Sequence, residues 1–552
     1  MAPLSPWIIV AAWSLLLPLA GRVLAPAWVR GVGLLGVGLA LAAAATLIGR
    51  ADLGVGVGLW GDAVVADRLA LLLDGTILLA LAAMLAGDPR ADADRHALVL
   101  LAGAGAMLCV HAGDVTLLVG GLELACLAAA ALLAREAERS GRAGFTWLIG
   151  QGLAAALLWL GLGLVYGATG TTRLAELAGR ISAVFLRWGA NTVQSAVDLL
   201  QSPSTLGGGL EAHARDVAVT GAAPAMLLIP GLLLAFAGLL ARFGAVPLQV
   251  GLAGVVGRAG AAGAGTVLVL VRMAAAAALL RLFVAVVHAP RVVYAPYGWG
   301  TAVAVLAGAS AVVGAIAAAR QAELRRLLAW STVANGGLAL LGMVAAADFY
   351  AHAGARRGGL GVSDHVDWGQ MFGDHAVAAV VLTLVMHALA CLGLLAAHAA
   401  FDRGRGHVDL VGLARRAPVS AIAIAVCLLG LAAVPPTGAF VARWALLTTG
   451  LEDSNLLVRA MLGLGLLASA ALAAGCLRVL VALGADEVPG GEGTSAGRWP
   501  RVVLAVLAAM VLGTGLMGQA SLETSQSAAH GAGLPPGGKA RRALATSAED
   551  VR

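Results

Sequence analysis

Apolar residues in this chain gather into long runs, and short polar segments separate one run from the next. Each run is roughly 18–25 residues long, the length that a helix needs to cross the hydrocarbon core of a bilayer. Within a bilayer the backbone must satisfy its own hydrogen bonds, so the runs are expected to be helices. No segment shows the alternating strands of about ten residues that a membrane barrel requires. The pattern therefore predicts an all-α, polytopic membrane protein.

We expect about fourteen transmembrane helices from these runs. They lie near residues 4–24, 31–49, 66–87, 96–113, 115–135, 144–167, 222–248, 260–288, 299–319, 326–347, 376–400, 417–447, 455–484 and 500–519. The first run lacks a basic segment before it and leads directly into a second apolar run. This arrangement favours a first transmembrane helix over a signal peptide.

Polar segments divide the series of runs into parts. Residues 170–220 contain the sequence RLAELAGRISAVFLRWGANTVQSAVDLLQ, which indicates an amphipathic helix at the membrane surface. Residues 349–375 are predicted to be a loop, and the polar tail 520–552 is predicted to be disordered. The expected parts are three N-terminal helices in 1–95, a first five-helix repeat in 96–288, a second, inverted repeat in 299–484 and a last helix in 485–519.

Composition supports the membrane class and limits the chemistry of the chain. Hydrophobic residues make up 60% of the chain and charged residues 12%, whereas soluble proteins carry about 25% charged residues. The cysteines all lie within apolar runs without CxxC spacing, so packing is favoured over disulfides or metal sites. The sequence contains no Fe–S cysteine cluster, Rossmann glycine fingerprint or haem motif, so no redox centre is expected in this chain.

Basic residues indicate the orientation of the chain in the membrane. All of them except Lys539 are arginine, and they concentrate in the short loops after odd-numbered runs, such as 135–142 and 403–416. Short loops after even-numbered runs hold far fewer. Because basic loops stay on the cytoplasmic side, both termini are predicted to face outward.

Two of the apolar runs contain proline after an Ala-Val pair. One is ARFGAVPLQVG, with Pro247, and the other is LAAVPPTGAF, with Pro435 and Pro436. Proline removes a backbone donor and breaks a helix, so both runs are predicted to be broken helices. They lie five runs apart, and an odd-numbered repeat of helices reverses its orientation in the membrane. Paired interrupted helices in inverted halves are the best sequence indication of a transport site.

Several charged residues lie within the apolar runs, namely Glu123, Arg242, Arg272 and Arg443. A charge at bilayer depth is costly and is by default a sign of function. An isolated carboxylate at Glu123 would take up a proton or find a cation. Arg242 and Arg443 each lie beside a predicted break, where the opened backbone also needs water or polar neighbours.

Some polar residues in the runs have a simpler explanation. Arg281 and Arg478 fit arginines whose long side chains extend to the membrane interface. His387, in VVLTLVMHALACLG, belongs to the residue type that titrates near physiological pH. A histidine that is merely hydrogen-bonded within the bundle explains it equally well.

Four segments carry recognisable motifs in a fixed order. They are HAGDVTLLVGGLELACLAAAALLARE, LVYGATGTTRLAEL, RQAELRRLLAWSTVANGGLALLGM and HVDLVGLARRAPVSAIAIAVCLLGLAAVPPTGAFVARW. They resemble the acidic fifth helix, the YGATG segment, the RQ…KRLLAYSSIAH signature and the second broken helix of an antiporter-like family. In this order they resemble subunit N of bacterial NADH–quinone oxidoreductase (respiratory complex I), over residues 65–520.

The resemblance implies a subunit that translocates protons with an intramembrane glutamate, a paired lysine and further lysines along a hydrated axis. By position, Glu123 matches the glutamate. Arg242, Arg272 and Arg443 match the lysines of the first broken helix, the eighth helix and the second broken helix.

The sequence departs from the family pattern in ways that change the expected chemistry. Phe145 or Thr146 stands where the family has a lysine at the start of its sixth helix, and Asn335 replaces a histidine. The family's segment after the first break is reduced to PLQVGLAGVVGRAGA. A desolvated lysine releases a proton, whereas an arginine effectively does not. The arginines are therefore expected to act as fixed charges, which leaves Glu123 and His387 to change protonation.

The expected function is that of a proton-translocating membrane subunit of complex I. NADH, FMN, Fe–S clusters and quinone are expected in partner subunits, and no cofactor or metal in this chain. The alternatives are a non-pumping structural subunit of the same complex, which the missing lysine and histidine favour, and a subunit of a cation/proton antiporter. Expected partners are the other membrane subunits, the lipid bilayer and, through the complex, the quinone pool, but no nucleic acid. The expected location is the bacterial inner membrane, with both termini periplasmic.

Overall fold

The computed structural model describes most of the chain. The described residues are 5–48, 53, 56–88, 92–136, 142–185, 223–249, 251–287, 299–357, 368–401, 410–453, 455–485 and 498–530. They are largely helical, and the strands among them are β1 (Val57–Leu59) and β2 (Val64–Ala66), which form one antiparallel hairpin. Twelve helices in this described part are long and apolar enough to cross a membrane. The prediction of an all-α, polytopic membrane protein is confirmed.

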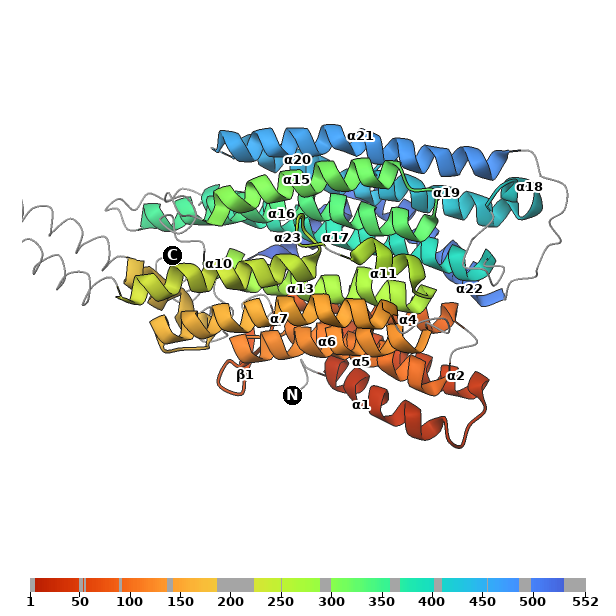
Figure 1. Ribbon diagram of the computed structural model, residues 1–552, viewed down its shortest axis with the longest axis horizontal. Coiled ribbons are helices and arrows are strands. Elements are labelled where there is room, and N and C mark those ends of the chain that lie inside the picture. Colours follow the sequence, from red (N-terminus) through yellow and green to blue (C-terminus); the bar gives the residue numbers. More distant parts are fainter. Residues whose placement is uncertain are drawn as a thin grey trace, which may run out of the picture.

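The long helices fall into an N-terminal half, a C-terminal half and a final pair (Figure 1). The N-terminal half contains α1 (Ser5–Ala20), α2 (Pro26–Ala45), α4 (Arg68–Gly87), α5 (Ala93–Val110), α6 (Val115–Glu136), α7 (Arg142–Thr169), α10 (Ala223–Phe243), α11 (Leu252–Arg258), α12 (Ala261–Gly265), η3 (Thr266–Val271), α13 (Arg272–Leu279) and η4 (Leu280–Val284). The C-terminal half contains α15 (Trp299–Ala319), α16 (Leu324–Arg357), α17 (Trp368–Phe401), α18 (Leu413–Arg416), α19 (Pro418–Ala432), α20 (Gly438–Glu452) and α21 (Leu456–Gly484). The final pair is α22 (Arg498–Leu516) and α23 (Gly518–Ala529).

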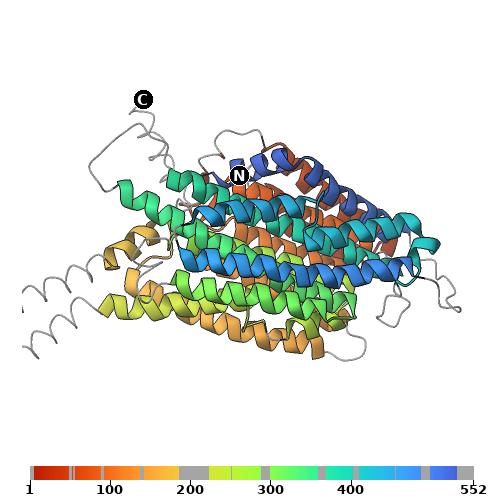
Figure 2. The same ribbon diagram turned by 90° about the horizontal axis from the view of Figure 1, so that it is seen from above.

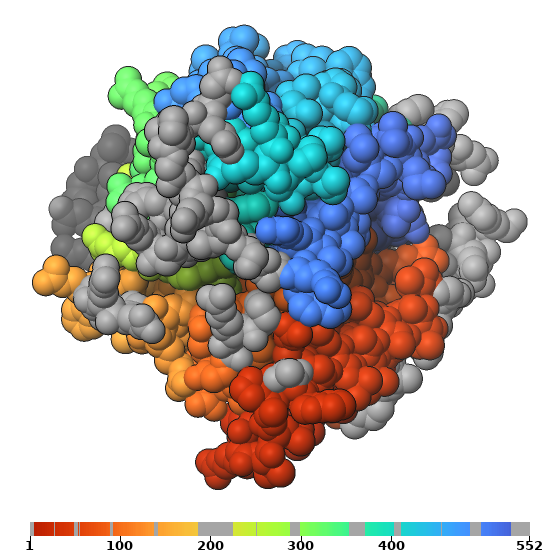
Figure 3. Space-filling model, turned by 90° about the vertical axis from the view of Figure 1, so that its right-hand side faces the viewer, coloured from red at the N-terminus to blue at the C-terminus, as the bar shows by residue number. Residues whose placement is uncertain are grey.

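The long helices run side by side along one axis, which is horizontal in Figure 1 and Figure 2. We call the end at which the β1–β2 hairpin lies the hairpin end, and the end at which α5 begins the opposite end. Seen from the opposite end, the N-terminal helices occupy one side of the molecule and the C-terminal helices the other (Figure 3). The halves meet where α17 packs against α4 and α12 and where α16 packs against α11, and α22 of the final pair also contacts α4.

The centre of the bundle is the continuous helical segment from α12 to η4. Every residue from Ala262 to Val284 is buried, because other helices surround this segment on all sides. Two stretches of it, η3 and η4, have π-helical geometry. Such wide turns are rare and are frequently found at functional sites.

Both predicted helix breaks are present. α10 ends at Phe243, and the chain passes Gly244 (φ 83°), Pro247 and Gly251 (φ 84°) before α11 begins. α19 ends at Ala432, and Pro435 and Pro436 follow before α20 begins at Gly438. Left-handed backbone angles favour glycine, so the two glycines explain how the chain turns out of α10 and into α11.

One predicted polar segment is helical as expected where it is described, and the two others differ from the structure in their extent. Residues 174–185 form a helix with one buried side, as an amphipathic helix should, while residues 186–220 lie outside the described residues. The predicted loop 349–375 is wrong in its extent, because α16 continues to Arg357 and α17 begins at Trp368. The helical continuation is held by Tyr350, whose hydroxyl donates to Asp374 Oδ1 over 2.7 Å. The predicted tail likewise begins too early, since α23 packs against α17 and α4.

Candidate functional site

Glu123 and Arg242 form an ion pair inside the N-terminal half. Arg242 Nη2 donates to Glu123 Oε1 over 2.5 Å, and the side chain of Arg242 is fully buried while that of Glu123 is 24% exposed. Arg242 also donates to Cys126 Sγ (2.8 Å) and to the carbonyl oxygen of Gln151 (3.3 Å). A buried charge needs a partner and further hydrogen bonds to be stable. The charged partner of Arg242 comes from α6, and its further hydrogen bonds come from α6 and α7.

Each broken helix ends in a carbonyl group that an arginine caps. At the end of α10, Arg272 Nη1 donates to the carbonyl oxygen of Phe243 over 3.4 Å. At the end of α19, Arg443 Nη1 donates to the carbonyl oxygen of Ala432 over 3.2 Å. The C-terminus of a helix carries unsatisfied carbonyls and a partial negative charge, so a cation there is stabilising. The two breaks therefore use the same arrangement, which explains how both arginines are tolerated.

Arg272 lies deep in the molecule, directly after the π-helical segment η3. Its guanidinium carbon is 4.3 Å from the centre of the Phe243 ring, a favourable cation–π position. Gly336 on α16 makes room for it, because a Cβ at this position would collide with Arg272 Nη2. Arg272 has no acidic partner among the described residues. The charge of Arg272 is therefore stabilised by the carbonyl dipole and the aromatic ring of Phe243 rather than by a carboxylate.

A cavity of about 450 Å³ lies between the first break and the central segment. Arg242, Arg272, Gln151, Gln249 and Thr332 line it, among mainly apolar residues. A cavity of this size with several polar groups is large enough to hold water. It connects Arg242 of the ion pair in the N-terminal half with Thr332 on α16.

A second polar cluster lies in the C-terminal half. Arg443 Nη2 donates to Asn335 Oδ1 over 2.8 Å, and Asn335 Nδ2 lies 3.3 Å from His387 Nδ1. His387 Nε2 in turn lies 2.9 Å from Thr332 Oγ1. The cluster thus joins α20, α16 and α17, and Thr332 also lines the cavity.

The hydrogen bonds of this cluster define the tautomer of His387. An arginine only donates, so it fixes the carbonyl oxygen of Asn335 toward itself and the amide NH₂ toward His387. Nδ1 of His387 must then accept, which places the ring proton on Nε2, facing Thr332. His387 is held neutral in this arrangement, and uptake of a second proton would break its bond with Asn335.

Together these groups form a polar line across the molecule. It runs from Glu123 and Arg242 through the cavity to Arg272, then through Thr332, His387 and Asn335 to Arg443. The structure thus brings all five candidate residues onto one line, with the three break prolines beside it. Thr332, Gln151 and Gly336 were not predicted from the sequence, and Asn335 was predicted only as a departure from the family pattern. The position of Asn335, one helical turn after Ser331 in a predicted span, was the available signal.

Arg281 is buried in the protein and does not reach solvent, so the interpretation of a side chain that extends to the membrane interface was wrong. Its guanidinium is buried, donates to both carboxylate oxygens of Asp67 (3.1 and 3.0 Å) and to the carbonyl oxygen of Val110 (2.7 Å). The acidic partner precedes a distant helix in the sequence, so spacing gave no indication of the pair. Arg478 fits the interpretation better, because its side chain is exposed and bonds the Gln321 carbonyl oxygen.

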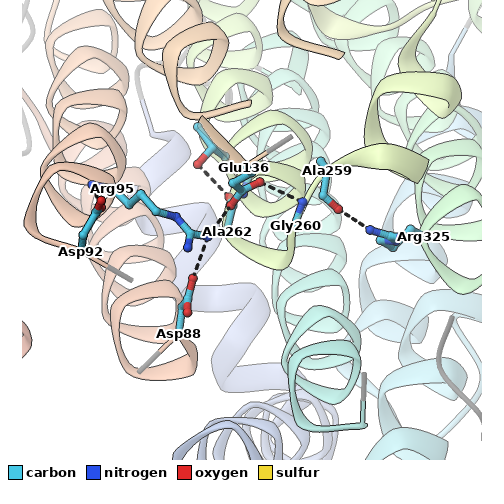
Figure 4. A network of polar contacts seen from close by, with 10 residues as sticks. Asp88, Asp92, Arg95, Glu136, Ala259, Gly260, Ala262 and Arg325 are labelled. Atoms are coloured by element: carbon cyan, nitrogen blue, oxygen red, sulfur yellow. Dashed lines mark hydrogen bonds and ion pairs between the residues drawn. The ribbon is translucent and has the colours of Figure 1, made fainter. Parts of the chain in front are cut away.

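A network at the opposite end fixes the helix of Arg272 against the helix of Glu123 (Figure 4). Glu136, at the end of α6, accepts hydrogen bonds from the amides of Gly260 (2.8 Å) and Gly263 (3.0 Å) at the start of α12. Arg95 Nη2 pairs with Glu136 (3.2 Å) and with Asp88 (3.1 Å). A carboxylate at a helix N-terminus satisfies unpaired amides. Glu136 therefore couples the positions of α6 and the central segment.

No group of three or more His, Cys, Asp or Glu side chains is placed to hold a metal ion within the part of the chain that the structure describes. The chemistry that the polar line offers is the holding and transfer of protons and water. Carboxylates and imidazoles are groups that can exchange protons near neutral pH, whereas guanidinium groups stay charged.

Comparison with known proteins identifies relatives over most of the chain. The family model for the membrane region of NADH:quinone oxidoreductases and Mrp antiporters matches residues 112–356 and 368–468. NADH-quinone oxidoreductase subunit N 1 of Sorangium cellulosum is 30% identical over 389 residues, which are 68% of this chain and 66% of the relative. Subunit N of Deinococcus radiodurans is 28% identical over 479 residues, covering 83% of this chain and 82% of the relative.

Solved structures share the fold. A chain of respiratory complex I from Thermus thermophilus superposes with a TM-score of 0.68 at 24% identity, covering 94% of this chain and 98% of that chain. A chain of the Mrp complex from Dietzia sp. superposes with a TM-score of 0.76 at 19% identity, covering 98% and 99%. The chain therefore belongs to the family of antiporter-like membrane subunits of NADH:quinone oxidoreductases and Mrp antiporters, among the N subunits of NADH-quinone oxidoreductase.

Proposed function

We propose that this chain is a proton-translocating subunit in the membrane arm of a bacterial NADH–quinone oxidoreductase. Partner subunits would bind NADH, FMN, Fe–S clusters and quinone, and this chain would move protons as the quinone is reduced there. In this assembly its partners are other membrane subunits and the bilayer. The arginine-rich loops support an inner-membrane orientation with the hairpin end in the periplasm.

The observation that carries the proposal is the polar line from Glu123 to Arg443. Buried charges within a bilayer are costly, and proteins keep them where ions or protons pass. Here they lie beside two broken helices and a cavity that is large enough for water. A structural bundle needs none of these features for its stability.

The residues of the line have different roles in the proposal. Glu123 is the group that takes up and releases a proton, and Arg242 stabilises its charged form. Arg272 and Arg443 keep their positive charge at all times. They therefore hold water molecules near them and disfavour an excess proton at their own positions. His387, held neutral by Asn335 and Thr332, relays a proton only when its bond with Asn335 opens.

A non-pumping structural subunit is the competing function. It is favoured by the N-terminal part of α7, where Phe145 is exposed and Thr146 lines the cavity, so that no cation occupies this place. A cation/proton antiporter subunit is a further candidate, because a chain of an Mrp complex has the same fold.

The test is the number of protons pumped per NADH oxidised in inverted membrane vesicles that contain Glu123→Gln. Glutamine keeps a hydrogen bond to Arg242 but has no exchangeable acid. Since positioned proton-transfer groups contribute about 10²–10⁴-fold in rate, we expect coupled NADH oxidation to fall at least about tenfold or the proton yield to drop. If both the rate of NADH oxidation and the proton yield were unchanged, a non-pumping structural subunit would be the better-supported function. Sodium-dependent proton release in vesicles without NADH would favour the antiporter.

A further inference from the structure

A second buried group of titratable residues lies at the hairpin end, away from the polar line. His111, just after α5, contacts Asp74 on α4, with 2.8 Å between His111 Nε2 and Asp74 Oδ2. Both side chains are inaccessible to solvent, at 1% and 0% exposure. Arg281 and Asp67 form the neighbouring ion pair. None of these residues has a role in the function proposed above.

The hydrogen bonds of His111 require a proton between the two side chains. Nδ1 of His111 lies 3.0 Å from the carbonyl oxygen of Val65, which only accepts, so Nδ1 carries a hydrogen. Nε2 faces a carboxylate oxygen at hydrogen-bond distance. A neutral imidazole with an ionised carboxylate would place two lone pairs against each other. The contact therefore holds one more proton, either on the imidazole or on the carboxyl group.

The charges around the pair agree with this extra proton. The charged groups that act on the pair from outside it are Asp67, which caps the start of α4, and Arg281 of η4. Arg281 balances Asp67, so Asp74 is balanced only if the pair with His111 holds a proton. A net charge in a solvent-free interior is strongly unfavourable.

The pair also has an unused acceptor. Asp74 Oδ1 is buried and has no hydrogen-bond partner among the described residues. Buried carboxylate oxygens normally have partners, and an exception calls for an unseen proton or water. Oδ1 is therefore a position at which a proton or a water molecule can enter or leave the pair.

The place of the pair in the fold connects it with Glu123. α5 and α6 touch through their backbones, since a Cβ at Gly121 would lie 2.6 Å from the amide nitrogen of Cys109. Cys109 is two residues before His111, and Gly121 is two residues before Glu123. Glu123 lies eight residues into α6, or about 12 Å along its axis from the hairpin end. The pair thus lies on the hairpin side of Glu123.

The hairpin covers the pair. His111 and Val65 bond each other twice, through the Val65 amide to the His111 carbonyl oxygen (2.7 Å) and through the imidazole to the Val65 carbonyl oxygen. The amide of Gly113 donates to the carbonyl oxygen of Ala63 over 2.8 Å. The hairpin therefore lies between the pair and the hairpin-end surface of the molecule.

We propose that His111 and Asp74 form a proton-binding site that receives the proton from the Glu123 side and passes it toward the hairpin end. The site rests on the function proposed above, because it is a second station for the same proton. Each transfer breaks one O–H or N–H bond and forms another, so no other covalent bond changes. The charges of Arg281 and Asp67 cancel each other, and the His111–Asp74 pair is neutral while it holds the proton.

The test compares the proton yield per NADH in vesicles with assembled complexes that carry Asp74→Asn, His111→Gln or Asp74→Glu. Asparagine and glutamine keep hydrogen bonds but hold no transferable proton, whereas glutamate keeps the acid. We expect a lower yield in the first two variants and a yield near wild type with Asp74→Glu. In Asp74→Asn the lone imidazole loses its proton as the pH rises, so the yield should fall with rising pH more steeply than in wild type.

His96→Gln is the matched control, because His96 is a buried histidine at the other end of the same helix. The inference is overturned if the yield stays at wild type in Asp74→Asn and His111→Gln while Glu123→Gln lowers it. It is also overturned if Asp74→Glu lowers the proton yield as much as Asp74→Asn does. Failure of Asp74→Asn and His111→Gln to assemble would likewise overturn it, since the pair is then structural. If Glu123→Gln also has no effect, the proposed function itself fails.

Discussion

At the scale of single residues, the substitution of arginine for lysine is the feature that most limits the mechanism. Arginines lie at the three positions where the family resemblance implies lysines, and each has a defined partner. Arg242 pairs with the Glu123 carboxylate. Arg272 contacts the ring and the carbonyl oxygen of Phe243, and Arg443 donates to the Ala432 carbonyl oxygen and the Asn335 side chain. A guanidinium does not release its proton. In the proposed function these residues therefore organise the line electrostatically, and proton exchange is assigned to Glu123 and His387.

Arg443→Lys and Arg443→Ala separate the charge from the shape of the side chain. A lysine keeps the positive charge beside the Ala432 carbonyl and regains the ability to release a proton, so we expect pumping to be retained or improved. Alanine leaves the end of α19 uncapped and Asn335 without its donor, so pumping should fall. The proton yield per NADH in vesicles measures both. Equal yields in wild type and both variants would rule out a role for this charge.

Asp453 offers a test by pH outside the membrane-spanning helices. Burial, together with the hydrogen bond and charge of Asp348, raises the pKa of Asp453 to about 8. At pH values between the pKa of Asp453 in the unfolded chain and its raised pKa in the folded protein, the folded protein keeps a proton that the unfolded chain has released. The free energy of unfolding therefore falls as the pH rises through this window.

We expect the melting temperature of the purified chain in detergent to decrease from about pH 5 to about pH 8.5. The decrease should be smaller in Asp453→Asn, which has no acid to titrate. A thiol-reactive dye reports unfolding, because the described cysteines are all buried in the folded chain. An identical pH dependence in wild type and variant would contradict the raised pKa.

At the scale of elements, the breaks and the central segment position the charges. The sequence predicted the broken helices correctly because proline and glycine act locally on the backbone. Their carbonyl caps were not predictable, since Arg272 reaches the end of α10 from a different helix. The same reason explains the error on Arg281, whose partner Asp67 lies 214 residues away.

Glu136→Gln tests the contact that couples α6 to the central segment. Glutamine loses the ion pair with Arg95 and one of the two oxygens that accept from Gly260 and Gly263. A buried amide left without an acceptor costs about 1–3 kcal/mol, so we expect a loss of stability in this range.

The control for Glu136→Gln is Asp94→Asn. Asp94 pairs with Arg135 at the same end of the molecule, but both side chains are about half exposed, and exposed pairs contribute about 0–1 kcal/mol. Detergent melting curves of the two variants provide the comparison. Similar losses in both would mean that Glu136 does not fix the start of α12.

At the scale of the whole molecule, the polar line unites two halves that each contain one broken helix and one arginine cap. The runs of the sequence predicted the class and both breaks, because these features depend on local hydrophobicity and backbone chemistry. The family resemblance singled out the charged residues that lie on this line, and their roles remain predictions. The links between them, through Thr332, Asn335 and the cavity, depend on side chains that meet only after folding.

The claim that this line works as one path is tested most directly by combining changes at its two ends. The measurement is the number of protons pumped per NADH oxidised in vesicles with Glu123→Gln, Arg443→Ala and the double variant, each corrected for the amount of assembled complex. Groups that act as a unit show non-additive effects. We predict that each single variant lowers the yield and that the double variant is no lower than the more affected single variant. A yield that falls by the sum of the two losses, or that stays at wild type in both single variants, would contradict a continuous path from Glu123 to Arg443.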